Sequence, residues 1–199
     1  MKIKLLQFVL IGLVIFVSSC EKDGSISPET LKQNKIEYNS QILPINGAGF
    51  VDYSLRSFFG NAPTHKNVDF YTIDGDFVTS KTGSLLDIKG KSVVFVELNS
   101  PNLDLIENAT YNFIDDSKDN SLTNSELSVK YAGKYFFSNG YLIASTQSAS
   151  LFTFSENIDV VSGTVKISGL KPNYLITYDL VLENGKTLKG SYAGNFKSL

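Results

Sequence analysis

The sequence predicts an all-β protein, and three observations carry this prediction. Apolar and polar residues alternate with a period of two over much of the chain after Ile42, as they do in half-buried strands. Turn dipeptides such as Asn184-Gly185 separate these runs. The chain has 14 Phe and 10 Tyr but a single Cys, so aromatic burial and not disulfides is expected to stabilise the core. Short strands at regular spacing favour an antiparallel β-sandwich or a barrel.

Residues 1–19 are expected to be a signal peptide. Lys2 and Lys4 precede an apolar run from Leu5 to Val17, and small residues follow it. A membrane-spanning anchor is the competing interpretation, but it needs ~20 apolar residues. The run is shorter than that, and the segment after it is strongly polar.

The segment Val17-Ser18-Ser19-Cys20 resembles the lipobox of bacterial lipoproteins. The resemblance implies cleavage before Cys20, a diacylglyceryl group on its thiol and an added N-acyl chain. A single acyl chain binds a membrane only marginally, whereas two or more hold it stably. Cys20 is the only cysteine of the chain and has no disulfide partner to explain it. The alternative is a signal peptide cut elsewhere, with Cys20 a spare thiol.

The polar stretch Glu21-Lys22-Asp23-Gly24 is similar to the export signal of Bacteroidota lipoproteins. This resemblance implies display on the outer face of the outer membrane, with the periplasmic face as the alternative. Residues 20–41 are expected to be the lipidated cysteine and a flexible tether, in which Pro28–Gln33 could form a short helix. Residues 42–199 are expected to form a single β domain.

Composition narrows the classes of partner. Removing residues 1–19 leaves 180 of 199 residues, enough for one β domain. It also removes two of the 18 basic residues. The remaining chain has 16 basic and 20 acidic residues, so the net charge changes from −2 to −4. No basic face suited to nucleic acid is implied.

The first half of the β domain is expected to contain a buried central strand and several half-buried ones. Ser92–Leu98 is a near-continuous apolar run, as in a strand buried on both faces. Asp74-Gly75-Asp76 is expected to turn a hairpin. The other strands expected here are Phe50–Leu55, Val68–Ile73, Phe77–Thr79 and Thr110–Ile114.

In the second half, Asn139-Gly140 is expected to join Tyr135–Phe137 and Tyr141–Ala144 in another hairpin. The clearest unit is the final hairpin, in which Asn184-Gly185 is expected to form a type I′ turn. Ile176, Tyr178, Leu180 and Leu182 would then share one face. With Gly163–Ser168 upstream, residues 151–196 are expected to form an antiparallel meander, for about nine to eleven strands in all.

The closing pattern, from Gly163-Thr164-Val165-Lys166-Ile167 to Ser191-Tyr192-Ala193-Gly194, resembles the C-terminal segment of many uncharacterised Bacteroidota lipoproteins. Their domains are lipocalin-like barrels or sandwich-like β folds. The resemblance implies a fold of this kind and no particular activity.

Histidine and cysteine, two side chains that commonly carry out catalysis, are scarce. His65 is the sole histidine and lies in an expected loop, so it is interpreted as a solvated loop residue. Zinc ligands of the usual His and Cys type are lacking. No catalytic residue, metal ligand or cofactor is predicted, and the ligand-binding residues stay unknown. Glu97 and Asp179 interrupt β-forming runs and are interpreted as strand residues on solvated faces, although a carboxylate pair is what a glycoside hydrolase uses.

Two further features can be interpreted either as functional or as purely structural. The aromatic residues at 135–137, Tyr141, Phe152 and Phe154 could form a platform for sugar rings or line a lipid cavity, or they could fill the core. Residues 115–126 place oxygen-bearing side chains at the spacing of a calcium-binding EF-hand loop. Asn120 replaces the expected glycine, and a strand precedes the loop where a helix is needed, so no calcium site is predicted.

These features favour three functions, in the following order of preference. The first is a non-enzymatic, membrane-anchored lipoprotein whose β domain binds glycan, protein or a small ligand, or belongs to an envelope assembly. The second is a lipocalin-like carrier of a small apolar ligand. The third is a carboxylate-based glycoside hydrolase.

Overall fold

The computed structural model describes residues 34–56, 64–150 and 157–199. The expected signal peptide, Cys20 and most of the expected tether lie outside these ranges, and so do Phe152 and Phe154. None of the helices in the described ranges has the length and apolar character to cross a membrane.

The fold is all-β, as the sequence predicts, and its described strands form one sheet. The pairing is antiparallel except between β3 and β12 and between β6 and β7. The strands are β1 (Lys35–Tyr38), β2 (Gln41–Pro44), β3 (Gly47–Arg56), β4 (His65–Thr79), β5 (Leu85–Ser100), β6 (Thr110–Phe113), β7 (Phe136–Phe137), β8 (Gly140–Ser150), β9 (Ile158–Leu170), β10 (Asn173–Leu182), β11 (Thr187–Asn195) and β12 (Lys197–Ser198). A 3-10 helix, η2 (Asp116–Asp119), and the helix α1 (Asn124–Tyr131) lie between β6 and β7.

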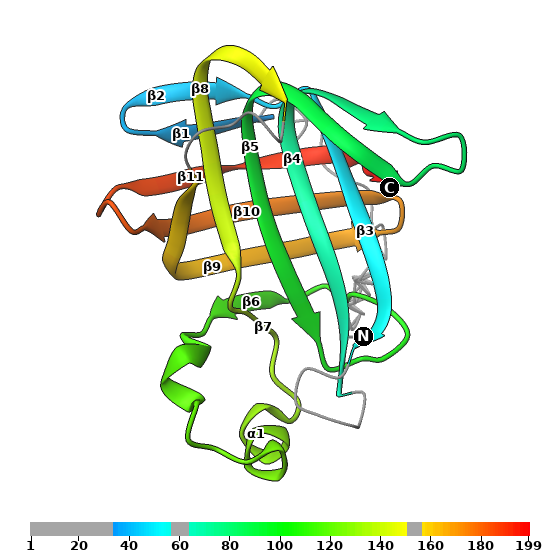
Figure 1. Ribbon diagram of the computed structural model, residues 1–199, viewed down its shortest axis with the longest axis vertical. Coiled ribbons are helices and arrows are strands. Elements are labelled where there is room, and N and C mark those ends of the chain that lie inside the picture. The colour runs from blue at the N-terminus through cyan, green and yellow to red at the C-terminus, as the bar shows by residue number, and fades with distance from the viewer. Residues whose placement is uncertain (1–33, 57–63, 151–156) are drawn as a thin grey trace, which may run out of the picture.

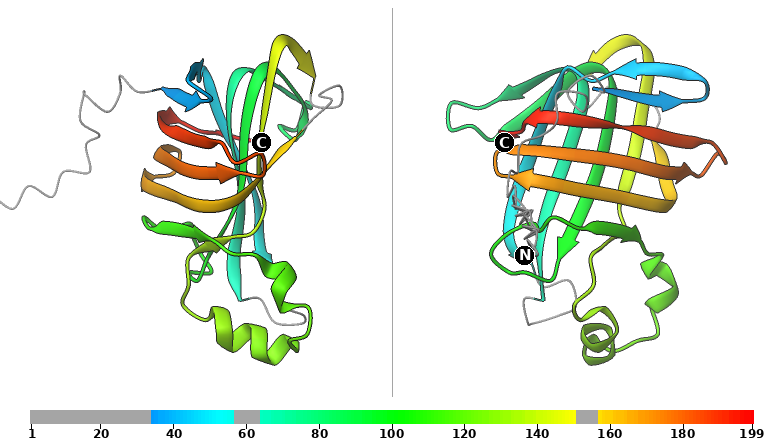
Figure 2. Two further views of the ribbon diagram at one scale, coloured as in Figure 1. Left: turned by 90° about the vertical axis from the view of Figure 1, so that its left-hand side faces the viewer. Right: turned by 180° about the vertical axis from the view of Figure 1, so that it is seen from behind.

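The sheet is bent so that its two halves pack face to face as two layers. Strands β3, β4, β5 and β8 form the first layer, and β9, β10, β11, β1 and β2 form the second. The strands of one layer run across those of the other, as Figures 1 and 2 show. Strand β8 pairs with both β5 and β9 and so joins the layers along one side.

The main core lies between the layers and is filled by large side chains. Ile176, Tyr178, Leu180 and Leu182 of β10 are all buried on one face, which confirms the alternation seen in the sequence. Tyr178 also forms a hydrogen bond across the core with the hydroxyl of Thr72 on β4, at 3.2 Å. Each buried aromatic ring removes roughly 150–250 Å² from water, so aromatic burial is a major source of stability here.

The predicted central strand is confirmed as part of β5. Val94, Val96 and Leu98 face the main core, while Val93 and Phe95 face a second buried cluster on the outer side of the first layer. β5 pairs with β4 on one side and with β8 on the other. A strand with neighbours on both edges and packing on both faces needs the continuous apolar run that the sequence shows.

The hairpin predicted at Asp74-Gly75-Asp76 is wrong, because β4 runs straight through these residues. The pairing with β5 shifts register between Asp74 and Gly75, which marks a β-bulge. A Cβ on Gly75 would lie 2.0 Å from the Lys89 carbonyl oxygen, so the glycine permits close strand contact and does not turn the chain. The turn comes later, where the Ser80 hydroxyl accepts hydrogen bonds from the amides of Thr82 and Ser84.

The hairpin predicted at Asn139-Gly140 is also wrong. Phe136 of β7 and Gly140 of β8 both pair with β5, opposite Asn99 and Val96. The chain therefore continues in one direction along β5 through this dipeptide. Pairing with β5 overrides the local turn propensity of Asn139-Gly140.

The C-terminal meander of β9, β10 and β11 is confirmed, but its final turn differs from the predicted type I′. Gly185 has a φ of 76°, whereas Asn184 does not have a positive φ. The amide of Gly185 donates to the Leu182 carbonyl, and the amide of Leu182 donates to the Lys186 carbonyl. This longer loop uses the glycine alone in the left-handed region.

The β domain begins before Ile42, which corrects the predicted boundary of the tether at residue 41. Lys35–Tyr38 forms β1 and pairs with β11 and with β2. Ile36 and Tyr38 are buried in the main core. Their alternation with Lys35 and Glu37 covers only four residues, which is too short to stand out from the polar stretch that precedes it.

Candidate functional site

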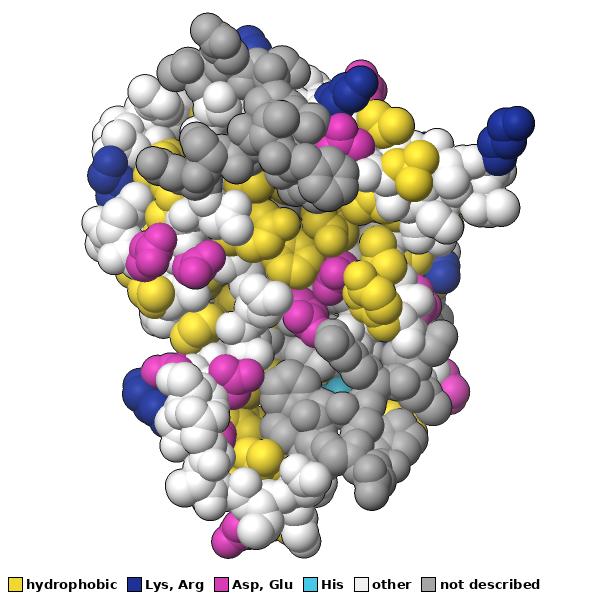
Figure 3. Space-filling model, in the orientation of Figure 1, with side chains coloured by type: hydrophobic (Ala, Val, Ile, Leu, Met, Phe, Trp, Pro, Cys, Tyr) yellow, Lys and Arg dark blue, Asp and Glu magenta, His cyan; other side chains and the backbone are white. Residues whose placement is uncertain are grey.

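The candidate site lies on the outer face of the first layer. Because side chains alternate along a strand, Val68, Phe70 and Thr72 of β4 face the core. Asp69, Tyr71 and Ile73 face outward. Asp69 on β4 stands directly opposite Glu97 on β5, and Asn67 stands opposite Asn99. Figure 3 shows hydrophobic side chains gathered around acidic ones in the middle of this face.

Amide side chains hold the carboxylate of Glu97 in place. Asn67 Nδ2 donates to Glu97 Oε1 at 2.9 Å and lies 3.1 Å from Asn99 Oδ1. Asn139 Nδ2 donates to Glu97 Oε2 at 3.2 Å. Hydrogen bonds to an ionised acceptor are stronger than neutral ones. Both oxygens of Glu97 are therefore fixed in direction, as in a site that is organised before its ligand arrives.

A row of aromatic rings adjoins these polar groups. The ring centroids of Tyr71 and Phe95 are 5.1 Å apart, and those of Phe95 and Tyr141 are 4.8 Å apart with a stacked geometry. Tyr71 donates its hydroxyl to Asp69 Oδ2 at 3.3 Å. We call Asn67, Asp69, Tyr71, Phe95, Glu97, Asn99 and Tyr141 together the polar-aromatic face.

Burial and the Asp69 carboxylate determine the protonation of these tyrosines. Burial first, and the negative charge of Asp69 second, raise the pKa of Tyr71 and of Tyr141 above the ordinary tyrosine value. Both hydroxyls therefore stay protonated at neutral pH and can donate hydrogen bonds. The face thus combines carboxylate acceptors with amide and phenol donors.

Part of the polar-aromatic face is open to solvent. Glu97 and Tyr141 are half-buried, and Asn139 and Tyr53 at its edge are exposed. Asp69, Tyr71 and Phe95 lie deeper and are buried. Two carboxylates, those of Asp69 and Glu97, therefore stand opposite each other where the buried part of this face meets the open part.

The structure does not bring Glu97 and Asp179 together. Asp179 lies on β10 in the second layer, where it is exposed and its carboxylate is 3.0 Å from the Lys189 ammonium. Its interpretation as a strand residue on a solvated face is confirmed. Glu97 departs from that interpretation, because its carboxylate is half-buried among amides.

Of the two interpretations left open for residues 135–137, the structure favours filling of the core over an aromatic platform. Phe136 and Phe137 are buried, and Tyr135 packs edge-on against Tyr111 with its hydroxyl on Glu107. Of the aromatic residues singled out in the sequence, Tyr141 is the one that the described structure places on the outer face.

His65 is not a solvated loop residue, which corrects the interpretation from sequence. It begins β4 and is 2 % exposed. Its Nε2 lies 3.2 Å from the Lys134 carbonyl oxygen, and its ring packs edge-on against Phe136. Burial lowers the pKa of His65, so its ring is a neutral structural group where the start of β4 packs against Phe136.

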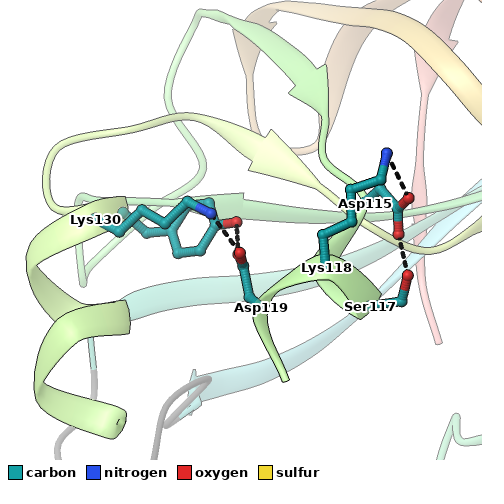
Figure 4. Close-up of polar contacts among 6 residues, drawn as sticks. Asp115, Ser117, Lys118, Asp119 and Lys130 are labelled. Carbon is teal, nitrogen blue, oxygen red and sulfur yellow. Dashed lines mark hydrogen bonds and ion pairs between the residues drawn. The ribbon is translucent and has the colours of Figure 1, made fainter. Parts of the chain in front are cut away.

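The carboxylates of Asp115 and Asp119 bind partners in η2 and α1 (Figure 4). Asp115 accepts from Ser117 and pairs with Lys118 at 2.9 Å, while Asp119 accepts from Lys130 and Tyr131. Glu126 instead completes a capping box with Thr123 at the start of α1. Over the described ranges, no three His, Cys, Asp or Glu side chains are grouped so that they could hold a metal ion.

Glu97 stands out in the sequence as a charge within an apolar run, whereas Asp69, Asn67 and Asn99 were not predicted as site residues. A signal is present in Asn67-Val68-Asp69-Phe70-Tyr71, where polar and aromatic residues alternate with apolar ones. A similar alternation in Glu97-Leu98-Asn99 would identify the partner strand. Neither segment by itself reveals that the two stand in register.

No model of a known protein family matches the chain, and the comparisons with curated proteins and with solved structures found no match. The function is therefore inferred from the chemistry of the site itself.

Proposed function

We propose that the chain is a lipid-anchored extracytoplasmic protein whose β domain binds carbohydrate on the polar-aromatic face. The observation that carries the proposal is the fixed carboxylate of Glu97, which lies beside the stacked rings of Phe95 and Tyr141 on a partly open surface. The anchor is inferred from the signal-like N-terminus and Cys20.

The chemistry of sugars fits these groups. A sugar ring presents hydroxyl groups at its edge and C–H groups on its faces, so it needs both hydrogen-bonding partners and a flat apolar surface. Carboxylates accept hydrogen bonds from hydroxyls, and amides and phenols donate to them. Aromatic side chains provide the flat surface, and Tyr adds a polar tip. A rigid sheet holds these groups without an ordering cost at binding.

The test is a glycan-array screen with the full-length protein in a mild detergent, followed by titration of the best ligand. Glu97→Gln keeps the shape of the side chain but removes its charge, and Tyr141→Ala removes the accessible ring. Hydrogen bonds to charged groups contribute about 1.5–3 kcal/mol and neutral ones about 0.5–1.5 kcal/mol. Because Gln keeps a neutral acceptor, Glu97→Gln should weaken binding about five- to tenfold.

Asp179→Asn is the matched control, because it neutralises an exposed strand carboxylate on the other layer. Its affinity should equal that of the wild type. Absence of any glycan ligand, or equal affinity of Glu97→Gln and wild type, would contradict the proposal.

A second candidate is hydrolysis of a glycosidic bond, and the observation that favours it is the pairing of Asp69 with Glu97. Directly opposed residues have Cβ atoms roughly 4.5–5.5 Å apart, and retaining glycosidases hold their carboxyl groups ~5–5.5 Å apart. Mass spectrometry of the bound oligosaccharides after long incubation would reveal cleavage. Intact ligands would leave binding as the function.

A further inference from the structure

A cavity lies on the inner side of the first layer, on the side opposite to the polar-aromatic face. This cavity, of about 290 Å³, opens between the inner face of β3 and β4, the loop after β5 and the turn between β9 and β10. We call it the end cavity. Its volume is close to the lower end of the range of small-molecule sites, ~300–1,000 Å³.

The inner wall of the end cavity is apolar and rigid. Phe50, Val68, Ile106 and Tyr174 line it and are all buried. Phe50 and Tyr174 meet edge to face at 6.5 Å, and both pack on Phe70 below them. A wall of interlocked rings keeps its shape, so the cavity does not have to be formed by the ligand.

One part of the cavity lining carries two lysine ammonium groups. Lys66 Nζ lies 2.6 Å from Asp52 Oδ1, and Lys171 Nζ lies 4.0 Å from Asp52 Oδ2. Lys171 also lies over the Phe50 ring, 4.6 Å from its centroid. Two ammonium groups therefore share the Asp52 carboxylate, and each keeps N–H donors that this carboxylate does not use. The Lys66 side chain is 10 % exposed. Asp104 adds a carboxylate at the exposed rim.

The rim carries exposed leucines. Leu105 is 50 % exposed and Leu170 is 78 % exposed, and both line the cavity. Gly169 positions Leu170: its φ is 103°, and a Cβ there would lie 2.5 Å from the Asn173 carbonyl oxygen. Exposed apolar side chains grouped around an apolar cavity are typical of a binding site.

We propose that the end cavity binds an amphipathic carboxylate with a medium-length acyl chain. The chain lies along Phe50, Val68 and Tyr174, and the leucines of the rim cover it. The carboxylate binds Lys171 and Lys66, which have N–H donors beyond those used by Asp52. This site shares no residue with the polar-aromatic face, so it stands independently of the proposed carbohydrate site.

The experiment is saturation-transfer NMR of the full chain in a perdeuterated nonionic detergent. The probes are octanoate, 1-octanol and octylamine, which share a chain and differ in the head group. Octanoate should give a saturable signal and bind at least tenfold more tightly than either other probe. Lys171→Met, at a half-exposed position, should weaken octanoate binding at least fivefold, and Leu105→Gln should weaken all three probes. Lys189→Met, which alters an exposed lysine on β11, should change nothing.

Thermal unfolding followed by circular dichroism establishes that each variant is folded. Equal binding of octanol and octanoate would overturn the role of the lysines. Preference for octylamine would overturn the assigned charge and make Asp52 and Asp104 the recognising groups. A signal that does not saturate and that no variant alters would show partition into micelles, and it would overturn the site.

Discussion

Replacing Phe70 with alanine tests whether aromatic burial between the layers stabilises the fold. Phe70 is 1 % exposed and lies at the centre of a ring cluster. Its ring centroid is 5.6 Å from that of Tyr174, 5.6 Å from that of Phe196 and 6.3 Å from that of Phe50. These partners come from three other segments, so the ring joins the first layer to the second and to the C-terminal end.

The magnitude follows from the area that the ring buries. An aromatic side chain buries roughly 150–250 Å², which at ~25 cal/mol per Å² gives about 4–6 kcal/mol. This is an upper bound, because the unfolded chain already buries part of its apolar surface. Measured Phe-to-Ala changes in cores cost ~3–5 kcal/mol, and we expect a loss in this range. The free energy of unfolding of a domain is only ~5–15 kcal/mol.

Urea unfolding followed by circular dichroism measures the difference. Phe70→Leu is the companion variant and should cost clearly less, because it retains much of the buried volume. Val129→Ala, at a residue of α1 that is 78 % exposed, should change the free energy of unfolding by less than ~0.5 kcal/mol. A loss below about 1 kcal/mol for Phe70→Ala would refute the idea that this cluster holds the layers together.

The remaining predictions concern the anchor and the helical segment. Cys20→Ala should abolish metabolic labelling with a fatty acid, because no other thiol exists to be lipidated; a labelled mutant would disprove the lipobox interpretation. Calorimetric titration with submillimolar calcium should show no binding, and saturable binding lost in Asp115→Ala would reverse this. Hydrogen bonds from Lys130 and Tyr131 lower the pKa of Asp119. They should therefore stabilise α1 at pH values above the ordinary Asp pKa of ~3.9, and this stabilisation should be lost as the pH falls through the lower pKa of Asp119 in the folded protein. Hydrogen exchange of α1 that depends on pH equally in Asp119→Asn and in the wild type would contradict this prediction.

The local pattern of apolar and polar residues was enough to predict the strands whose burial is most regular. Ile176 to Leu182 bury every second side chain, and the apolar run in β5 marks a strand packed on both sides. These features depend on residues close in sequence. The two failed hairpins show the limit, because the glycines at 75 and 140 have roles set by a neighbouring strand.

The candidate site was only partly predictable for the same reason. Glu97 stood out as a charge within an apolar run, but Asp69 had no local feature that connected it to Glu97. Their opposition depends on the register between β4 and β5, which shifts at the bulge of Asp74 and Gly75. A shift of one residue would turn either side chain toward the opposite face.

NMR titration of the full-length protein with its tightest-binding oligosaccharide tests the central claim most directly. Chemical-shift changes should be centred on Glu97, Asn99 and Tyr141, and Glu97→Gln should weaken the binding that they report about five- to tenfold. Changes confined to β9–β11, or a binding curve that Glu97→Gln leaves unaltered, would contradict carbohydrate binding at the polar-aromatic face.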